Sequence, residues 1–183
     1  MLAFNAIHQQ IFFALYHLLG PESYVSGVTI FFAQWFPYLV VAAALAYEVF
    51  VRNEGEILRA MTRIYVPPLF VLAMTELFKQ FFAFPRPFAA LDIPSSIIVR
   101  DPFGSFPSSH TAFFAALGVT MYFCNPKLGK WFLASALIIG IVRVGTGVHW
   151  PLDILGGFLI GASLAYLIEK VSLLLWKNRA PLC

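Results

Sequence analysis

Long apolar segments, separated by short polar connections, make up most of this 183-residue chain. Several of them approach or exceed the roughly 20 residues that a helix needs to cross the hydrocarbon core of a bilayer. Hydrophobic residues account for 60% of the sequence and charged residues for only 11%, which is far more apolar than a soluble domain. The sequence therefore predicts an all-α integral membrane protein, with a single domain over residues 1–183.

Proline, glycine and charged residues divide the apolar segments into five predicted spans. The predicted transmembrane helices cover residues 28–51, 57–84, 108–124, 131–144 and 151–176. Pro37 is expected to bend the first of them, and Pro85-Arg86-Pro87 to stop the second. The small residues Gly157 and Gly161 in the last span favour close packing against another helix. The expected architecture is a helical bundle of five transmembrane helices.

The first 20 residues are apolar but interrupted by polar side chains. Asn5, His8 and Gln9 would share one face of a helix in this segment. We therefore predict an N-terminal amphipathic helix that lies in the membrane interface over residues 1–20. A short span is the alternative, and it would raise the number of transmembrane helices to six.

Lysine and arginine residues are distributed unequally over the two sets of span ends. One set carries Arg52, Arg59, Arg63, Lys127, Lys130, Lys170, Lys177 and Arg179, and the other carries Lys79, Arg86, Arg100 and Arg143. Because positively charged loops stay in the cytoplasm, the first set and the C-terminus are expected there. The net charge of +3 does not indicate nucleic-acid binding, since the cations belong to short loops between spans.

The octapeptide FGSFPSSH, residues 103–110, leads directly into the predicted span that ends at residue 124. Ser108 or Ser109 is the expected N-cap, which places His110 in the first helical turn. Free backbone N–H groups and the positive end of the helix dipole favour an anion at this position. A capped helix with an incidental histidine is the simpler alternative.

Three cations are expected at the same outward-facing set of span ends as His110. Ionisable residues at membrane depth are costly and suggest a function. Arg86 and Arg143 can each offer a two-pronged guanidinium to phosphate oxygens, and Lys79 a point charge. Each cation alone could be a span-end residue whose charge reaches the interface. Together, beside a helix N-terminus, they predict a phosphate-binding site.

His149 and Asp153 are four residues apart, so one helical turn can bring the carboxylate to the imidazole. A carboxylate in that position fixes the tautomer of a histidine and stabilises its imidazolium. His110 could then attack phosphorus while protonated His149 donates to the leaving oxygen. A zinc site is the alternative for two histidines and a carboxylate, but the neighbouring cations would repel a metal ion.

Taken together, the three segments carry a family pattern. Lys79-x6-Arg86-Pro87, Pro107-Ser108-Ser109-His110 and Arg143-x5-His149-x3-Asp153 resemble the three-part signature of the type-2 phosphatidic acid phosphatase superfamily. The resemblance implies a helical-bundle membrane phosphatase that needs no metal or other cofactor and works through a phosphohistidine. It implies His110 as nucleophile, His149 as acid and base, Asp153 as its orienting partner, and Lys79, Arg86, Ser108, Ser109 and Arg143 as phosphate ligands. Ser109 stands where the family usually has Gly, and Val142 where it usually has Ser.

The predicted substrate is a phosphorylated membrane lipid, because an outward-facing site at the bilayer surface suits a lipid whose tail stays in the membrane. The short chain and the aromatic run over residues 31–38 resemble the small bacterial undecaprenyl-diphosphate phosphatases of this superfamily. That resemblance implies the bacterial inner membrane, a site facing the periplasm and a role in cell-wall biogenesis. Phosphatidylglycerophosphate, phosphatidate and lipid A phosphates are alternative substrates, and phosphoryl transfer to another lipid is an alternative reaction. A small channel or scaffold with a structural polar cluster is the non-enzymatic alternative.

Overall fold

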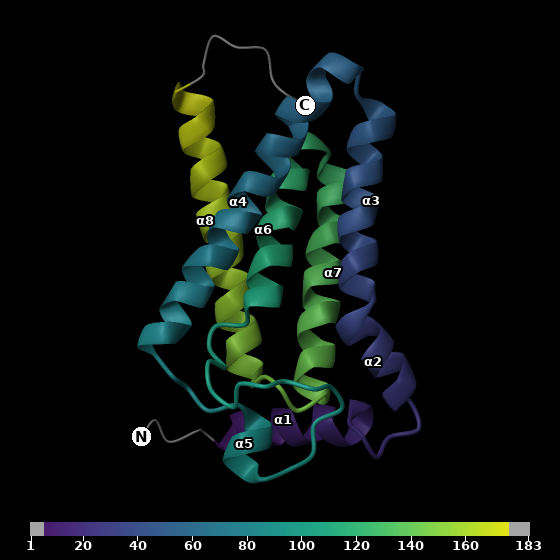
Figure 1. The fold of residues 1–183 in the computed structure, drawn as a ribbon, viewed down its shortest axis with the longest axis vertical. Coiled ribbons are helices and arrows are strands. Elements are labelled where there is room, and N and C mark those ends of the chain that lie inside the picture. The colour runs from purple at the N-terminus through teal and green to yellow at the C-terminus, as the bar shows by residue number, and fades with distance from the viewer. Residues whose placement is uncertain (1–5, 176–183) are drawn as a thin grey trace.

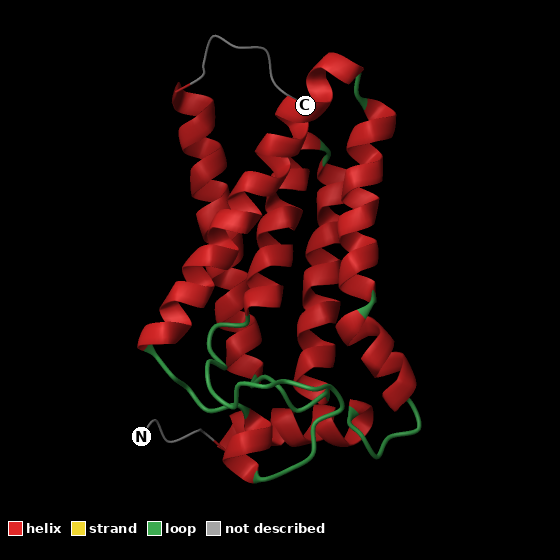
Figure 2. Cartoon of the chain, in the orientation of Figure 1, coloured by secondary structure: helices red, strands yellow, loops and turns green. Residues whose placement is uncertain are grey.

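Helices account for all the regular secondary structure in residues 6–175, the part of the chain that this computed structural model describes (Figure 2). They are α1 (Ala6–Leu19), α2 (Ser26–Gln34), α3 (Phe36–Val51), α4 (Glu54–Phe81), α5 (Pro87–Leu91), α6 (Ser109–Cys124), α7 (Pro126–Gly145) and α8 (Pro151–Leu175). The all-α prediction is confirmed for these residues. The predicted end of the last span at residue 176 lies outside them, as do Asn5, Lys177 and Arg179.

Three helical segments are long and apolar enough to cross a membrane, namely Gly55–Phe81 within α4, α7 and α8. The consecutive helices α2 and α3 meet the same criteria together, so they make a fourth if they form one broken span. α6 is also apolar, but its 16 residues are fewer than the roughly 20 of a straight span. The chain is therefore a multi-helix membrane protein.

The first predicted span is interrupted. The sequence predicts one helix over residues 28–51 with a bend at Pro37, but the structure has two helices that meet at Trp35 with a bend of 42°. Pro37 lies in the first turn of α3, where its missing N–H is harmless because first-turn N–H groups have no partner within the helix. Proline favours the start of a new helix over the continuation of an old one, so the break precedes it.

Other helix boundaries also differ from the prediction, since α2 begins at Ser26 instead of residue 28 and α4 at Glu54 instead of residue 57. α4 ends at Phe81 instead of residue 84, because Phe82 leaves the helical conformation with φ −127° and ψ 84°. α7 begins at Pro126 instead of residue 131. The Asn125 side chain caps this earlier start by accepting the N–H groups of Lys127 and Leu128 at 3.1 and 3.2 Å. The cap allows the helix to include the charged residues Lys127 and Lys130.

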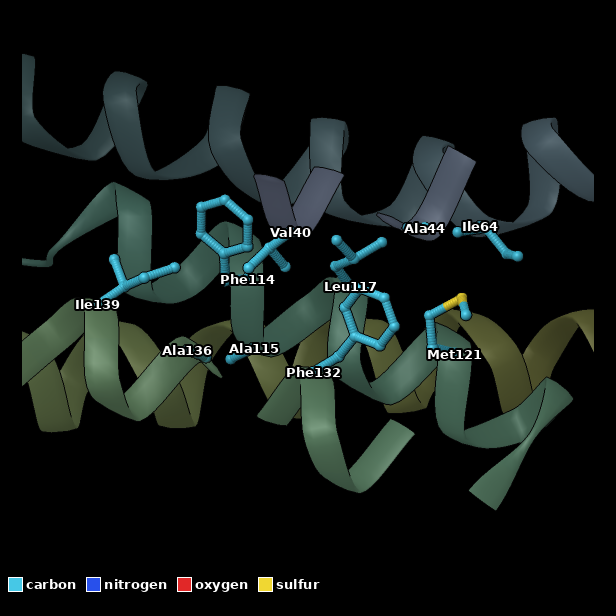
Figure 3. Close-up of a cluster of buried hydrophobic side chains, with 10 residues drawn as sticks. All are labelled: Val40, Ala44, Ile64, Phe114, Ala115, Leu117, Met121, Phe132, Ala136 and Ile139. Carbon is cyan, nitrogen blue, oxygen red and sulfur yellow. The ribbon is translucent and has the colours of Figure 1, made fainter. Parts of the chain in front are cut away.

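α6 is the central helix of the bundle and contacts α4, α7 and α8 (Figure 1). Apolar side chains of α3, α4, α6 and α7 form a buried core around it (Figure 3). The core residues are Val40, Ala44, Ile64, Phe114, Ala115, Leu117, Met121, Phe132, Ala136 and Ile139. Helix α6 is therefore held on several sides, which fixes the position of its N-terminus.

Glycines make the contact between α8 and α6, as their spacing predicts. A Cβ atom built on Gly157 would lie 2.5 Å from the backbone oxygen of Ser108, and one on Gly161 would lie 2.1 Å from that of Ala112. The two backbones therefore approach each other directly. This contact sets the distance between the start of α6 and the first turns of α8.

Replacing Gly161 by alanine is expected to destabilise the bundle, because the atom in the way belongs to the α6 backbone and cannot rotate aside. Overpacking of this kind costs about 1–3 kcal/mol. Thermal unfolding in detergent should show a lower midpoint for Gly161→Ala than for Gly27→Ala, whose new Cβ atom would meet nothing within 4 Å. Equal midpoints for the two variants would contradict the close contact.

Helix α1 lies across the end of the bundle at which α4 ends and α6 begins (Figure 1). Its Phe12 side chain is fully buried and lies 5.0 Å from the Trp150 ring, measured between centroids. The hydroxyl of Tyr16 donates to the carbonyl of Pro94 at 2.6 Å. α1 thus contacts two of the loops at this end of the molecule.

The polar face predicted for α1 is only partly correct. Gln9 is exposed, but His8 is buried against Trp150, with 5.5 Å between the ring centroids. The exposed surface of α1 includes large apolar side chains such as Ile7 and Leu18. A histidine ring fits the aromatic cluster around Trp150, and the exposed apolar residues suit a helix at the lipid–water interface.

Two cations at the opposite end of the bundle are paired within the protein. Arg52 Nε lies 3.2 Å from an oxygen of the buried Glu48, and Arg63 NH2 lies 2.9 Å from an oxygen of the buried Glu169. The second pair links α4 to α8. Buried charges need such partners, since an isolated one is strongly destabilising.

Candidate active site

The three predicted motif segments come together at the end of the bundle where α1 lies (Figure 1). They surround a cavity of about 430 Å³. The cavity is lined by Glu76, Lys79, Gln80, Arg86, Asp101, Gly104, His110, Arg143 and His149. Lys79, Arg86, His110, Arg143 and His149 were all predicted as site residues, although they come from three helices and two loops.

Ser108 is the N-cap of α6, which confirms one of the two predicted positions. Its Oγ accepts from the backbone N–H of Thr111 at 3.5 Å and from the Thr111 hydroxyl at 3.1 Å. Its own N–H donates to the backbone oxygen of Asp153 at 3.0 Å. Because these groups are already engaged within the protein, a direct contact of Ser108 with phosphate stays a prediction.

The next two residues of α6 differ in their exposure. Ser109 is buried, and its side chain interacts with the carboxylate of Glu76. His110 is exposed, and part of its exposed surface lines the cavity. Its position in the first turn of α6 is the predicted one, so its ring is accessible to a bound ligand.

Arg143 contributes a buried guanidinium from the last turn of α7. Its side chain is only 8% exposed, and its Nε has no hydrogen-bond partner in the described part of the chain. None of the ion pairs formed there includes it. A buried guanidinium is costly unless an anion satisfies it, so this residue is placed to bind an anion that enters the cavity.

Arg86 is held at the cavity wall by backbone carbonyls. Its Nε donates to the oxygens of Asp101 at 3.0 Å and Phe103 at 3.2 Å, and its NH1 donates to Val148 at 3.1 Å. NH1 also lies 3.4 Å from Nε2 of His149. Burial lowers the pKa of Arg86, but a guanidinium keeps its charge at neutral pH because its ordinary pKa is so high.

The predicted pairing of His149 with Asp153 is present, with 3.3 Å between Nδ1 and Oδ2. The carboxylate favours a proton on Nδ1, which leaves Nε2 to accept from Arg86. Burial, followed by the charges of Arg143 and Arg86, lowers the pKa of His149 well below its usual range. The lowered pKa favours the neutral imidazole, and a nearby anion would favour its protonation.

Two groups that the sequence analysis did not single out also hold Asp153. Ser105 is fully buried, and its hydroxyl donates to Oδ2 at 2.5 Å. The backbone N–H of Trp150 donates to the same oxygen at 2.7 Å. Trp150 immediately precedes α8 and occupies the N-cap position, and Asp153 is the third residue of the helix. Its carboxylate accepts the N-cap N–H, as the side chain at the third helical position of a capping box does. The spacing Trp150-Pro151-x-Asp153 is a sequence signal for that bond.

The zinc alternative requires His110, His149 and Asp153 to converge on one point. Instead, Oδ2 of Asp153 faces Nδ1 of His149 and two other donors. Within residues 6–175, no group of three or more histidine, cysteine, aspartate or glutamate side chains is placed to hold a metal ion. The arrangement of donors fits an anion bound among cations.

The fold is a bundle of membrane helices, and the cavity at one end is lined by cations and histidines. These features define a helical membrane protein with an anion-binding cavity. Residues 60–177 match the family model of the PAP2 superfamily, and the chain belongs to this family. It is 29% identical over 153 residues to the bacitracin transport permease protein BcrC of Bacillus licheniformis, covering 82% of this chain and 73% of the relative. It is 26% identical over 170 residues to the undecaprenyl-diphosphatase BcrC of Bacillus subtilis, covering 92% and 86%.

A solved structure shares the fold. The crystal structure of Aquifex aeolicus LpxE superimposes with a TM-score of 0.71 at 23% identity, covering 93% of this chain and 99% of that one. At this level of identity the likeness concerns the arrangement of the helices.

Proposed function

We propose that this chain is a lipid phosphatase that converts undecaprenyl diphosphate to undecaprenyl phosphate. The observation that carries the proposal is the buried guanidinium of Arg143, whose Nε lacks a partner in the described residues, in a cavity that also holds Lys79, Arg86 and two histidines. Family membership supports a phosphatase, and the name of the Bacillus subtilis relative supports the substrate.

In the first proposed step, a neutral nitrogen of His110 attacks the terminal phosphorus of the substrate. The bond between nitrogen and phosphorus forms as the bond from phosphorus to the bridging oxygen breaks. His149 gives its Nε2 proton to that oxygen, which leaves as undecaprenyl phosphate. The three cations stabilise the charge on the transferred phosphoryl oxygens.

In the second proposed step, water attacks the phosphohistidine. Neutral His149 takes a proton from the water, the bond between phosphorus and His110 breaks, and inorganic phosphate is released. Asp153 stabilises the imidazolium in both steps through Nδ1, with its own position set by Ser105 and Trp150.

In this mechanism, substrate binding changes the charged groups around the His149 ring and therefore its pKa. Arg86 NH1 faces the nitrogen that must carry the transferred proton. A bound phosphate would draw the guanidinium toward its oxygens and add negative charge beside the imidazole. Both changes oppose the lowered pKa of His149 and favour the imidazolium that the first step needs.

We propose five transmembrane crossings, formed by α2 with α3, α4, α6, α7 and α8, with α1 in the interface. α6 is short, but it is surrounded by other helices, and a buried helix does not have to match the bilayer thickness by itself. The bacterial relatives support an inner-membrane location. The distribution of cations supports a cavity that faces the periplasm and a C-terminus in the cytoplasm.

Cysteine labelling tests this orientation. In a variant without the two native cysteines, a membrane-impermeant maleimide should label Ile98→Cys in intact cells but label Lys130→Cys only after lysis. Both positions are exposed, and they lie at opposite ends of the bundle, so access depends on the side of the membrane. Labelling of Lys130→Cys alone in intact cells would place the cavity in the cytoplasm.

Phosphate release from a substrate panel tests the function. The purified protein in detergent should act on undecaprenyl diphosphate at a higher kcat/KM than on phosphatidylglycerophosphate, phosphatidate or lipid A phosphate. Activity should persist in EDTA, because cations of the protein neutralise the phosphoryl oxygens. Activity that is lost in EDTA and restored by zinc or magnesium would contradict the proposed mechanism.

The other substrates give distinct outcomes. A preference for lipid A phosphate or phosphatidate would leave the proposed reaction unchanged but would identify a different substrate. Transfer of phosphate to an added acceptor lipid would make the protein a phosphotransferase. No release from any lipid would favour the structural alternative.

A further inference from the structure

The cavity contains a carboxylate that none of the predicted roles explains. Glu76 lies on α4, and its Oε1 is 3.1 Å from the Nζ of Lys79, one turn further along the same helix. The Glu76 side chain is 55% exposed, whereas that of Lys79 is 12% exposed. Glu76 therefore pairs with a proposed phosphate ligand and also lines the space that the phosphate would enter.

This pairing distinguishes Lys79 from the two arginines. Among the ion pairs of residues 6–175, neither Arg86 nor Arg143 has a carboxylate partner. Asp101 also lines the cavity, but its Oδ1 accepts the backbone N–H of Phe103 at 2.9 Å, within its own loop. Glu76 is thus the carboxylate that competes directly with phosphate for a cation.

We infer that Glu76 is a product-release residue, which holds Lys79 in the empty site and recaptures it when inorganic phosphate leaves. The inference rests on the proposed function. Three cations around a buried anion would bind inorganic phosphate tightly and slow turnover. A carboxylate beside one of them repels the phosphate dianion and offers Lys79 an alternative partner.

The exposure of the pair suits such an exchange. Partly exposed ion pairs are weak, because water screens them and two flexible side chains must be ordered. An entering phosphate can therefore take Lys79 from Glu76, and the carboxylate can regain it afterwards. A pair whose carboxylate is buried, such as that of Arg63 with Glu169 at the other end, would be too costly to break in each cycle.

Inhibition by inorganic phosphate tests this role. Glu76→Gln removes the charge and keeps the size of the side chain, so the inhibition constant for phosphate should fall about tenfold relative to the unmodified protein. On undecaprenyl diphosphate, kcat should fall while kcat/KM is kept or rises, because release becomes slower and capture does not. Damage to the site would instead weaken phosphate binding, so tighter inhibition cannot arise from a structural defect.

Asp101→Asn is the matched control, since it removes one negative charge from the same cavity without touching the Lys79 pair. It should change the inhibition constant by less than Glu76→Gln does. Equal tightening in both variants, or no tightening in Glu76→Gln, would overturn the inference. If Glu76→Gln does not fold, Glu76→Asp can replace it, because this change shortens the side chain and weakens the pair with Lys79. The inhibition constant for phosphate should then fall by less than the tenfold expected for Glu76→Gln. An unchanged or higher inhibition constant would overturn the inference. Absence of phosphatase activity in the unmodified protein would instead contradict the proposed function.

Discussion

Replacing His110 by alanine is expected to reduce phosphate release to background and to abolish the covalent phosphoenzyme. The proposed reaction passes through a bond between phosphorus and a His110 nitrogen, and no other histidine lies at the start of α6. Removal of a nucleophile that acts as part of a catalytic unit can lower the rate by a factor on the order of 10⁶. Brief reaction with labelled substrate, followed by alkaline quenching, should trap acid-labile phosphate only on the unmodified protein.

The control for this variant is His17→Ala, which removes an exposed histidine of α1 outside the cavity. It should keep both turnover and the trapped phosphate. The His110→Ala protein should also still bind phosphate, because the three cations remain. Acid-labile phosphate on His149, in a His110→Ala variant that stays active, would show that the two histidine roles are reversed.

Replacing His149 by alanine is expected to lower turnover of undecaprenyl diphosphate about 10²–10⁴-fold, the usual range for loss of general acid catalysis. The loss should be much smaller with a nitrophenyl phosphate, whose leaving group departs without a proton. This dependence on the leaving group separates proton donation from a structural defect, which would affect both substrates equally.

Asp153→Asn provides the companion test. It should act in the same direction as His149→Ala but more mildly, because the imidazole remains and only its orienting charge is lost. The amide would also have to accept from Ser105 and Trp150, so its oxygen should occupy the position of Oδ2. A loss that is equal for both substrates in each variant would contradict the acid role of His149.

The order and spacing of the motifs were sufficient to predict which segments meet. Lys79, His110 and His149 come from different parts of the chain, but each lies at the same kind of span end. In a bundle whose helices alternate in direction, such ends must lie on one side of the membrane. The cap at Ser108 was predictable for a local reason, because its partner is within the same helical turn.

Contacts between distant residues were not predictable in this way. Ser105 lies inside the octapeptide of residues 103–110, yet its partner Asp153 is 48 positions away and no spacing rule connects them. His8 was expected on a polar surface, because the helical face around it is polar, and the Trp150 ring that buries it belongs to a different segment. Pairings of this kind depend on how the helices pack, which periodicity does not encode.

The position of α1 has a consequence for how the protein is made. α1 is synthesised before the other helices of the bundle, but Phe12 and His8 are covered by Trp150, and the end of α1 packs against Gly145 of α7. The ribosome therefore has to complete most of the chain before α1 can reach its final position. Until α8 follows α7 into the bilayer, the inner face of α1 has only lipid or a chaperone to cover it, and the loops that carry Pro94 and His149 lack their support.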